Sequence, residues 1–368
     1  MKVLLLSQYS PFVGGIETRS QNMVKYMENE FLIVSPLLPP HNKHPHRDFS
    51  PGVLYLDYSN RGQFLRAIEE HVDMREVAVI DVQCNVYLGL LGLMISQKTK
   101  KPLISSFHMN LQYPDHAEKA FFAAHADLID QLVHESDGIV CVSESVKQSV
   151  FDFSPAAETK RSRIHVVRNG VDLDTFHPPK KERSRDGKEA ILFVGRFSKE
   201  KNIPFLLTLY SKIRKHHDYV LWLVGDGPER KSVEQLVRTL RIEDSITFWG
   251  NLYGEELARV YAAASYTVSP SVTEAFGMTT LESVACGTPV LASSNPGTTE
   301  LMHQLEGGIL FPSENLEGAL AAFQQLANEY DHYRTTGLKN VQKFAWPHVL
   351  FPLKEIYDEY LTGSKITK

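Results

Sequence analysis

Two glutamates, Glu274 and Glu282, lie on either side of a predicted junction between a strand and a helix. Apolar and β-branched residues between 266 and 272 come first, Gly277 follows, and good helix formers continue to Ala285. A glycine at such a junction lets the backbone approach a ligand closely, and the N–H groups of a first helical turn bind anions. The pattern predicts a nucleotide-sugar site with one carboxylate at its entrance and one deeper. Two surface glutamates near an ordinary helix start are the alternative.

Two cations follow another predicted strand. Arg196 comes directly after Gly195, at the end of the apolar run 190–194, and Lys201 lies in the same segment. Arginine binds phosphate through paired hydrogen bonds, whereas lysine acts as a compact charge. If they converge at the carboxyl end of the strand, they would stabilise a diphosphate as a leaving group. A solvated charged loop is the alternative.

The first half of the chain has two candidate features at its strand ends. Gly14 and Gly15 follow the first apolar run and precede the first predicted helix, where paired glycines let the backbone pass close to a phosphate or sugar. A simple tight turn would use the same residues. His108 ends the apolar run 103–107, and we expect it to donate to a sugar hydroxyl or to stabilise developing charge. A structural histidine is the alternative.

Two further motifs suggest chemistry that we do not predict. The Gly-Asp-Gly-Pro segment beginning at Gly225 approaches the dinucleotide fingerprint, but Arg230 stands where the third glycine is expected. We interpret it as a turn beside the nucleotide, not as an NAD site. Asp172 and Asp174 match an Asp-x-Asp pattern that binds a divalent metal in another class of sugar transferase. The preceding Asn-Gly favours a turn there, and no metal site is predicted.

These residues depend on strands that alternate with helices along the whole chain. Such alternation predicts parallel sheets covered on both faces. In the first half, strands are expected at 3–6, 31–34, 77–82, 103–107, 138–142 and 164–167, and helices at 18–27, 88–98, 117–134 and 143–150. In the second half, strands are expected at 190–194, 220–224, 245–249, 266–270, 290–292 and 308–311. Helices are expected at 204–215, 230–240, 255–263 and 346–361, and another is expected to follow Gly277 and end at Ala285.

A charged, turn-forming segment divides the two halves. Residues 178–188 have no apolar period and read as an interdomain linker. The predicted domains are therefore 1–177 and 189–345, two doubly wound, Rossmann-like α/β domains that face each other across a cleft. Ligands of such sheets bind outside the carboxyl ends of the strands.

Length and composition limit the class of protein. The chain has 368 residues, enough for two domains, and a net charge of −5, which argues against a nucleic-acid partner. Its three isolated cysteines fit a reducing cytoplasm. The first apolar run is too short for a signal peptide, and the run 87–95 is too short to span a membrane. We expect a cytoplasmic protein, with weak peripheral contact at the inner membrane face left open.

Together these motifs resemble the family-4 retaining glycosyltransferases, which have the GT-B fold. The second half matches more closely than the first. The matching residues are Gly14–Glu17, Phe107–His108, Asn169–Asp172, Val194–Arg196 with Lys201, Gly225–Pro228, Glu274–Gly277 with Glu282, and Ala285–Val290.

The resemblance implies a role for each group. Arg196 and Lys201 would hold the donor diphosphate, Glu282 the ribose hydroxyls, and Glu274 the transferred sugar. His108 would contact that sugar from the first domain, where acceptors bind. The C-terminal helix, 346–363, would return onto the first domain. The implied catalytic residues are His108, Arg196, Lys201 and Glu274, and the implied donor-binding residues are Gly14, Gly15, Gly195, Gly225, Phe276, Gly277, Met278, Thr279 and Glu282.

We therefore predict metal-independent, retaining transfer of a hexose from a nucleoside diphosphate sugar to an acceptor hydroxyl, in carbohydrate biosynthesis. The donor is a co-substrate and no other cofactor is expected. A uridine nucleotide is preferred because it is common in the family, and a glycan, a lipid-linked sugar or a small molecule is the expected acceptor. A sugar-nucleotide epimerase with the same fold and a non-catalytic nucleotide-sugar binding protein are the alternatives. The oligomeric state is not predicted. Residues 41–76 match no pattern, and Pro296–Glu300 depart from the family.

Overall fold

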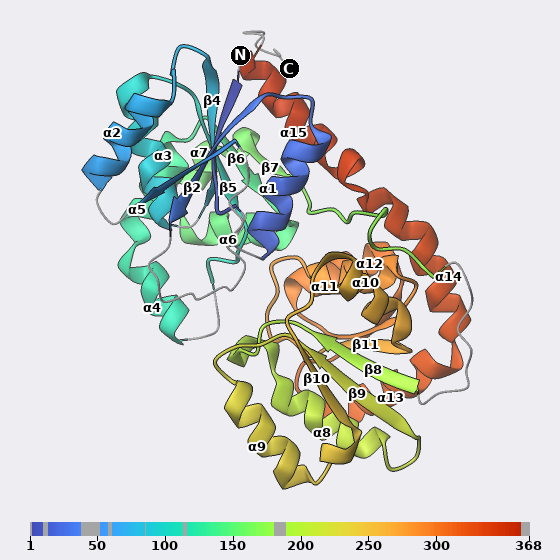
Figure 1. Ribbon diagram of the computed structural model, residues 1–368. Coiled ribbons are helices and arrows are strands. Elements are labelled where there is room, and N and C mark those ends of the chain that lie inside the picture. The colour runs from blue at the N-terminus through green and yellow to red at the C-terminus, as the bar shows by residue number, and fades with distance from the viewer. Residues whose placement is uncertain are drawn as a thin grey trace. The chain divides into compact units, whose positions relative to one another are not determined.

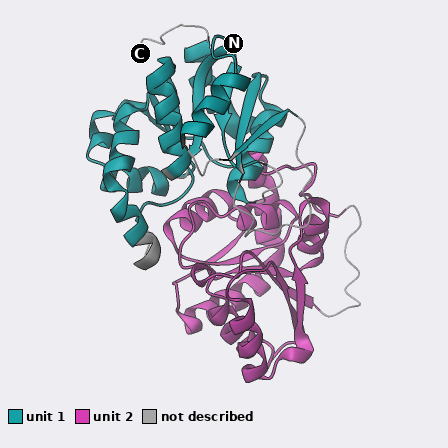
Figure 2. Cartoon of the chain, turned by 60° about the vertical axis from the view of Figure 1, so that its left-hand side comes forward, with its two compact units in different colours: residues 1–169, 346–368 teal, residues 170–345 magenta. Residues whose placement is uncertain are grey.

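The computed structural model describes residues 2–9, 14–37, 52–57, 61–84, 86–112, 116–179 and 189–361 (Figure 1). The chain forms two compact units (Figure 2), one of residues 1–169 with 346–368 and the other of residues 170–345. Each unit is built on a parallel sheet flanked by helices, which confirms the predicted α/β class. None of the helices in the described ranges is long and apolar enough to cross a bilayer.

The sheet of the first unit has seven strands in the order β3-β2-β1-β4-β5-β6-β7. Each neighbouring pair is parallel. The central strands are predictable because a parallel strand covered on both faces is apolar throughout. The strands are β1 Lys2–Leu6, β2 Phe31–Leu37, β3 Val53–Asp57, β4 Val77–Cys84, β5 Leu103–Phe107, β6 Gly138–Cys141 and β7 Ile164–Val166.

Helices cover both faces of this sheet, and β4 shows how. Successive strand residues point to opposite faces. Val82 lies beneath α3, where Gly92 packs close to its side chain, whereas Asp81 faces α15 and bonds Tyr357. The helix α15 also contacts α1. The helices of this unit are α1 Gly15–Tyr26, α2 Arg61–His71, α3 Val86–Thr99, α4 His116–Ala124, α5 Ala126–Glu135, α6 Glu144–Phe153, α7 Ala156–Thr159 and α15 Trp346–Leu361.

The second unit has a six-stranded sheet in the order β10-β9-β8-β11-β12-β13, again parallel throughout. Its strands are β8 Glu189–Val194, β9 Tyr219–Val224, β10 Ile246–Gly250, β11 Tyr266–Ser269, β12 Val290–Ser293 and β13 Gly308–Phe311. Its helices are α8 Ile203–Ile213, α9 Arg230–Leu240, α10 Gly254–Ala263, α11 Met278–Ala285, α12 Pro296–Leu305, α13 Leu316–Asn328 and α14 Tyr330–Asn340, with the short 3-10 helices η2 Lys199–Lys201, η3 Glu243–Ser245 and η4 Val341–Phe344.

Three details differ from the sequence prediction. Residues 41–76, for which the sequence predicted no helix or strand, contain β3 and α2. The predicted helix 117–134 is two helices, α4 and α5, separated at His125. The first unit ends at Asn169 and not at residue 177. Val171 already belongs to the second unit, where it forms a β-bridge with Ala345. Most of the predicted linker, residues 180–188, and the end of the predicted C-terminal helix, 362–363, lie outside the described residues.

Candidate active site

An ion pair joins the two predicted loops of the second unit. Lys201 closes η2, after β8, and Glu274 lies between β11 and α11. The Lys201 Nζ and Glu274 Oε1 atoms are 2.5 Å apart, although the residues are 73 positions apart in the sequence. Their side chains are 19% and 15% exposed. The strands β8 and β11 are hydrogen-bonded neighbours, so their carboxyl ends bring the cation and the carboxylate together.

Hydrogen bonds from two sides hold the loop that carries Glu274. The Val272 N–H donates to the Glu200 carbonyl at 2.8 Å, which ties this loop to η2. On the other side, Asn295 Nδ2 donates to the Ser271 carbonyl at 3.1 Å, and Ser293 Oγ donates to the same oxygen. The peptide group between Ser271 and Val272, just before Glu274, is therefore held from both sides by hydrogen bonds.

The start of α12 completes this support. Asn295 caps the helix, because its Oδ1 accepts from the Thr298 N–H at 3.0 Å. A Cβ atom on Gly297 would lie 2.3 Å from the Glu274 carbonyl oxygen, so only glycine permits this approach. Sequence analysis missed both residues. The order Asn-Pro-Gly was a usable signal, since asparagine before proline is typical of a helix start.

The helix α11 begins shortly after Glu274 with backbone donors that have no acceptor within the helix. Its N-cap is Gly277, whose φ of 99° is in the left-handed region that glycine favours. The N–H groups of Met278 and Thr279 precede the first intrahelical hydrogen bond, so they have no acceptor within the helix. Phe276 is 4% exposed and lies against Phe344, with ring centroids 6.4 Å apart. Its side chain therefore anchors the turn, while the backbone after it is available to a ligand.

Glu282 lies in the second turn of α11 and faces the interior of the unit. Its Oε2 accepts a hydrogen bond from the Tyr261 hydroxyl at 3.2 Å. Burial raises the pKa of the Glu282 carboxyl to about 7, although the Tyr261 hydroxyl opposes this shift. The described contacts place Glu282 against Tyr261 and not against the Lys201–Glu274 pair. This carboxyl is thus half-ionised near neutral pH in the free protein.

The Gly-Asp-Gly-Pro segment has a packing role that the sequence did not reveal. A Cβ atom on Gly225 would lie 1.9 Å from the Gly195 carbonyl oxygen, and one on Gly227 would lie 2.5 Å from the Phe197 carbonyl oxygen. The Phe197 N–H also donates to the Asp226 carbonyl at 2.9 Å. These contacts fix the loop that carries the exposed Arg196. The glycines therefore allow one loop to press on another.

The remaining predicted residues belong to the first unit. His108 follows β5 and its Nε2 lies 2.8 Å from Gln83 Oε1. Burial, aided by the positive charge of Arg19, holds the pKa of His108 well below its ordinary value. Gly14 is the N-cap of α1, and its carbonyl accepts from the Thr18 N–H at 3.0 Å. Gly15 has open space where a side chain would be.

Two family models together match most of the chain. The model described as Glycosyltransferase Family 4 matches residues 13–175, and the model described as Glycosyl transferases group 1 matches residues 175–340. This chain belongs to the family-4 glycosyltransferases. The junction of the two matches, residue 175, lies close to the boundary between the two compact units.

Three curated proteins are similar in sequence to this glycosyltransferase. An alpha-monoglucosyldiacylglycerol synthase of Streptococcus pneumoniae is 30% identical over 73% of this chain, which spans 65% of that protein's length. An uncharacterized glycosyltransferase of Methanocaldococcus jannaschii is 26% identical over 98% of both chains. A D-inositol 3-phosphate glycosyltransferase of Mycolicibacterium smegmatis is 28% identical, over 75% of this chain and 66% of its own length.

Solved structures show that the glycosyltransferase has the GT-B fold. Sucrose-phosphate synthase from Thermosynechococcus elongatus superposes with a TM-score of 0.79 at 20% identity, covering 99% of this chain and 100% of its own. The Anabaena protein HepE, solved in complex with UDP-glucose, superposes with a TM-score of 0.77 at 17% identity and the same coverage. The predicted fold is confirmed.

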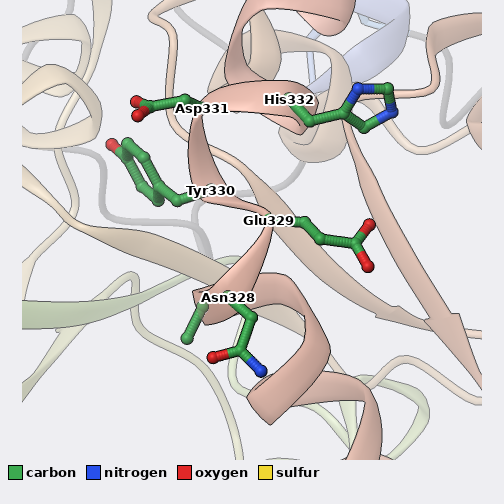
Figure 3. Close-up of a pocket in the computed structure, with 6 residues that line it drawn as sticks. Asn328, Glu329, Tyr330, Asp331 and His332 are labelled. Carbon is green, nitrogen blue, oxygen red and sulfur yellow. The ribbon is translucent and has the colours of Figure 1, made fainter.

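Two other features of the glycosyltransferase are the Asp-x-Asp segment and a surface hollow. Asp172 accepts from the Asp174 N–H at 3.1 Å and so forms the predicted turn, and no cluster of metal-ligating side chains occurs among the described residues. A hollow at the α13–α14 junction is lined by residues 327–332. Its labelled side chains point in different directions, with Tyr330 and Asp331 on one side and Glu329 and His332 on the other (Figure 3).

Proposed function

We propose that this glycosyltransferase moves a hexose from a nucleoside diphosphate sugar to an acceptor hydroxyl, with retention at the anomeric carbon and without a metal ion. The observation that carries the proposal is the Lys201–Glu274 pair beside the start of α11. It combines a cation for phosphate, a carboxylate for sugar hydroxyls and unpaired helix N–H groups within one loop cluster. Arg196, Gly195 and Gly225 are proposed to complete the diphosphate site.

A uridine diphosphate sugar is the proposed donor. HepE, which has the same fold, was solved in complex with UDP-glucose, and the streptococcal relative is an alpha-monoglucosyldiacylglycerol synthase. We propose that Glu282 accepts hydrogen bonds from the ribose hydroxyls, since it is the partly buried carboxylate deeper along α11. The backbone from Phe276 to Thr279 and the Glu274 carboxylate are proposed to hold the sugar. No further cofactor is proposed.

The proposed step is a displacement on one face of the sugar. The bond from the anomeric carbon to the diphosphate oxygen breaks, the acceptor oxygen bonds the same face, and its proton passes to the leaving phosphate. Arg196, Lys201 and the start of α11 stabilise the negative charge that develops on that phosphate. His108 is proposed to contact the transferred sugar, and Gly14 and Gly15 to line its approach.

A panel of nucleotide sugars tests the proposal. We expect slow hydrolysis of one uridine diphosphate hexose in the presence of a chelator, with release of UDP and of a sugar whose anomeric configuration is retained on first appearance by NMR. Formation of an isomeric nucleotide sugar from donor alone would instead identify an epimerase. Donor binding with no release of nucleoside diphosphate across a broad acceptor panel would identify a binding protein.

Donor affinity should depend on pH through Glu282. Because its pKa is about 7 in the free protein, the carboxylate that accepts from a ribose is mostly protonated at pH 6 and mostly ionised at pH 8. Only the ionised form offers all its oxygens as acceptors. We expect the Kd for UDP-glucose, measured by calorimetry, to be about tenfold higher at pH 6 than at pH 8.

The variant Glu282→Gln is the control for this pH dependence. It keeps the shape of the side chain and the oxygen that faces Tyr261 but cannot titrate. UDP-glucose is a suitable probe because its diphosphate does not change charge in this range. The Kd of the variant should be nearly constant from pH 6 to pH 8. An unchanged slope in the variant would show that another group titrates and that Glu282 does not hold the donor.

A further inference from the structure

A buried chain of hydrogen bonds runs from α15 to His108 within the first unit. The Tyr357 hydroxyl donates to Asp81 Oδ2. Asp81 Oδ1 is 2.8 Å from Gln83 Nε2, and Gln83 Oε1 is 2.8 Å from His108 Nε2. The first three residues are fully buried. The proposed function uses only His108 from this hydrogen-bond network, so the other three residues need a separate explanation.

The sheet places the members of the chain on one face. Asp81 and Gln83 are two positions apart on β4, so their side chains point to the same face of the sheet. Ser106 of β5 is the register partner of Gln83, and its hydroxyl also donates to Asp81, at 3.3 Å. His108 lies two residues beyond Ser106 along the same strand direction. The geometry is thus set by the strand register, with Tyr357 added from α15.

The carboxylate gives the chain a direction. An ionised carboxylate only accepts hydrogen bonds, so the Gln83 amide must turn its NH₂ group toward Asp81. Its carbonyl oxygen then faces His108 and also only accepts. The Nε2 atom of His108 must therefore carry a proton, an assignment made from the network and not from hydrogen positions. The Nδ1 atom has no hydrogen-bond partner among the residues that the structure describes.

We propose that Asp81 and Gln83 are positioning residues that hold His108 as the neutral Nε2–H tautomer and leave Nδ1 to accept a hydrogen bond from a substrate hydroxyl. The inference deepens the proposed function, because it specifies the chemistry that His108 recognises. The ligand group is an O–H donor, whereas a carboxylate or phosphate oxygen has no proton to offer. His108 then orients a hydroxyl and does not supply positive charge to the leaving group.

The charges that face this chain support a neutral ring. The Arg19 guanidinium from α1 lies in the same region and contributes to the low pKa of His108. Burial raises the pKa of Asp81 to about 6, opposed by Tyr357 and by Arg19. Above pH 7 the ring is therefore neutral and the carboxylate ionised, which is the state that gives the chain its direction.

Nitrogen-15 NMR of histidine-labelled protein at pH 7.5 tests the tautomer without any substrate. The ring signals of His108 are assigned by their loss in His108→Gln. We expect a protonated Nε2, an unprotonated Nδ1 and an Nε2–H proton that exchanges slowly with water. A protonated Nδ1, or a doubly protonated ring, in the wild-type protein would overturn the proposal.

Two variants and one control separate positioning from general stability. Asp81→Asn allows the hydrogen bonds to run in either direction, so we expect the Nδ1–H tautomer to appear beside the Nε2–H form. Gln83→Leu removes the acceptor, and we expect the Nε2–H proton to exchange at least tenfold faster. Ser105→Ala removes a buried hydroxyl bond to Ser136 on the opposite face of β5 and should leave the His108 signals unchanged. Wild-type signals in both Asp81→Asn and Gln83→Leu would refute the assignment.

A kinetic measurement links the tautomer to transfer. With the donor found in the panel, we expect Gln83→Leu to lower kcat about tenfold, while Ser105→Ala keeps the wild-type value. A wild-type kcat in Gln83→Leu would show that the tautomer is irrelevant to transfer and would overturn the positioning role. If the panel finds no donor, the proposed function fails, while the NMR result still decides the tautomer independently.

Discussion

Replacement of Lys201 by alanine is expected to lower kcat/KM for transfer by a factor of about 10², because it removes a preorganised cation from the leaving diphosphate. This factor corresponds to a loss of about 3 kcal/mol of transition-state stabilisation. The Nζ atom is already fixed by Glu274 at 2.5 Å before any donor binds, so little reorganisation precedes the reaction. The measurement is steady-state release of UDP in the presence of the acceptor or of water. We expect the loss to appear mainly in kcat, since the charge develops as the bond breaks.

Lys199→Ala provides a matched control for this prediction. Lys199 lies in the same 3-10 helix as Lys201, carries the same charge and is exposed. Its removal changes the long-range field of the loop by the same unit charge but removes no contact to Glu274. It should therefore keep activity within about twofold of wild type, as expected for a screened surface charge. Equal losses in Lys199→Ala and Lys201→Ala would point to net charge alone.

Glu274→Gln distinguishes the two members of the pair. The amide keeps a hydrogen-bonding oxygen for a sugar hydroxyl but no longer attracts Lys201 electrostatically. If the pair acts as a unit, Lys201→Ala and Glu274→Gln combined will cost less than the sum of the single losses, as expected for residues in direct contact. Wild-type kcat/KM in the Lys201→Ala variant would contradict the proposed site outright.

The elements around the site were predictable because their signals are local. The strands β8, β9 and β11 are short apolar runs that end at glycine or at polar residues, and each was placed within about one or two residues of its observed bounds. The edge strand β3 was not, since its residues Val53–Leu56 are only partly buried and the strand has no long apolar run. The helix 117–134 was predicted as one because its apolar period is continuous. The structure interrupts it at His125, whose ring lies 2.8 Å from the Phe121 carbonyl.

The contacts that position the side chains depend on tertiary structure. Sequence identified Lys201 and Glu274 as separate features at strand ends, but their ion pair needs the neighbouring positions of β8 and β11. The Asp81–Tyr357 hydrogen bond joins residues 276 positions apart and depends on how α15 packs on β4. No periodicity or spacing rule predicts such a contact. Residue type therefore predicted the chemistry, and strand order supplied the geometry.

Gly225 also shows that residue type is visible in the sequence whereas its contacts depend on tertiary structure. Its substitution is the second change for which we expect a large effect. Sequence analysis predicted Gly225 beside the donor, a role that is still proposed, and the structure adds that the Gly195 carbonyl oxygen occupies the space that a side chain at position 225 would need. In Gly225→Ala the new Cβ would lie 1.9 Å from that oxygen, on a backbone whose φ is 126°. We expect the free energy of unfolding, measured by urea denaturation, to fall by about 3 kcal/mol. The displaced loop should also weaken UDP binding at least tenfold.

Gly254→Ala is a control for backbone strain without a steric clash. Gly254 also has a left-handed φ, 51°, but open space where a Cβ would be. Its substitution should cost about 1 kcal/mol from backbone strain alone, with no change in UDP affinity. The extra cost of Gly225→Ala then reports the contact that holds the loop of Arg196 and Lys201 against its neighbour, together with the greater strain of a φ of 126°. If Gly225→Ala is no more destabilising than Gly254→Ala and binds UDP normally, the two loops separate without cost, and the diphosphate site does not depend on their contact.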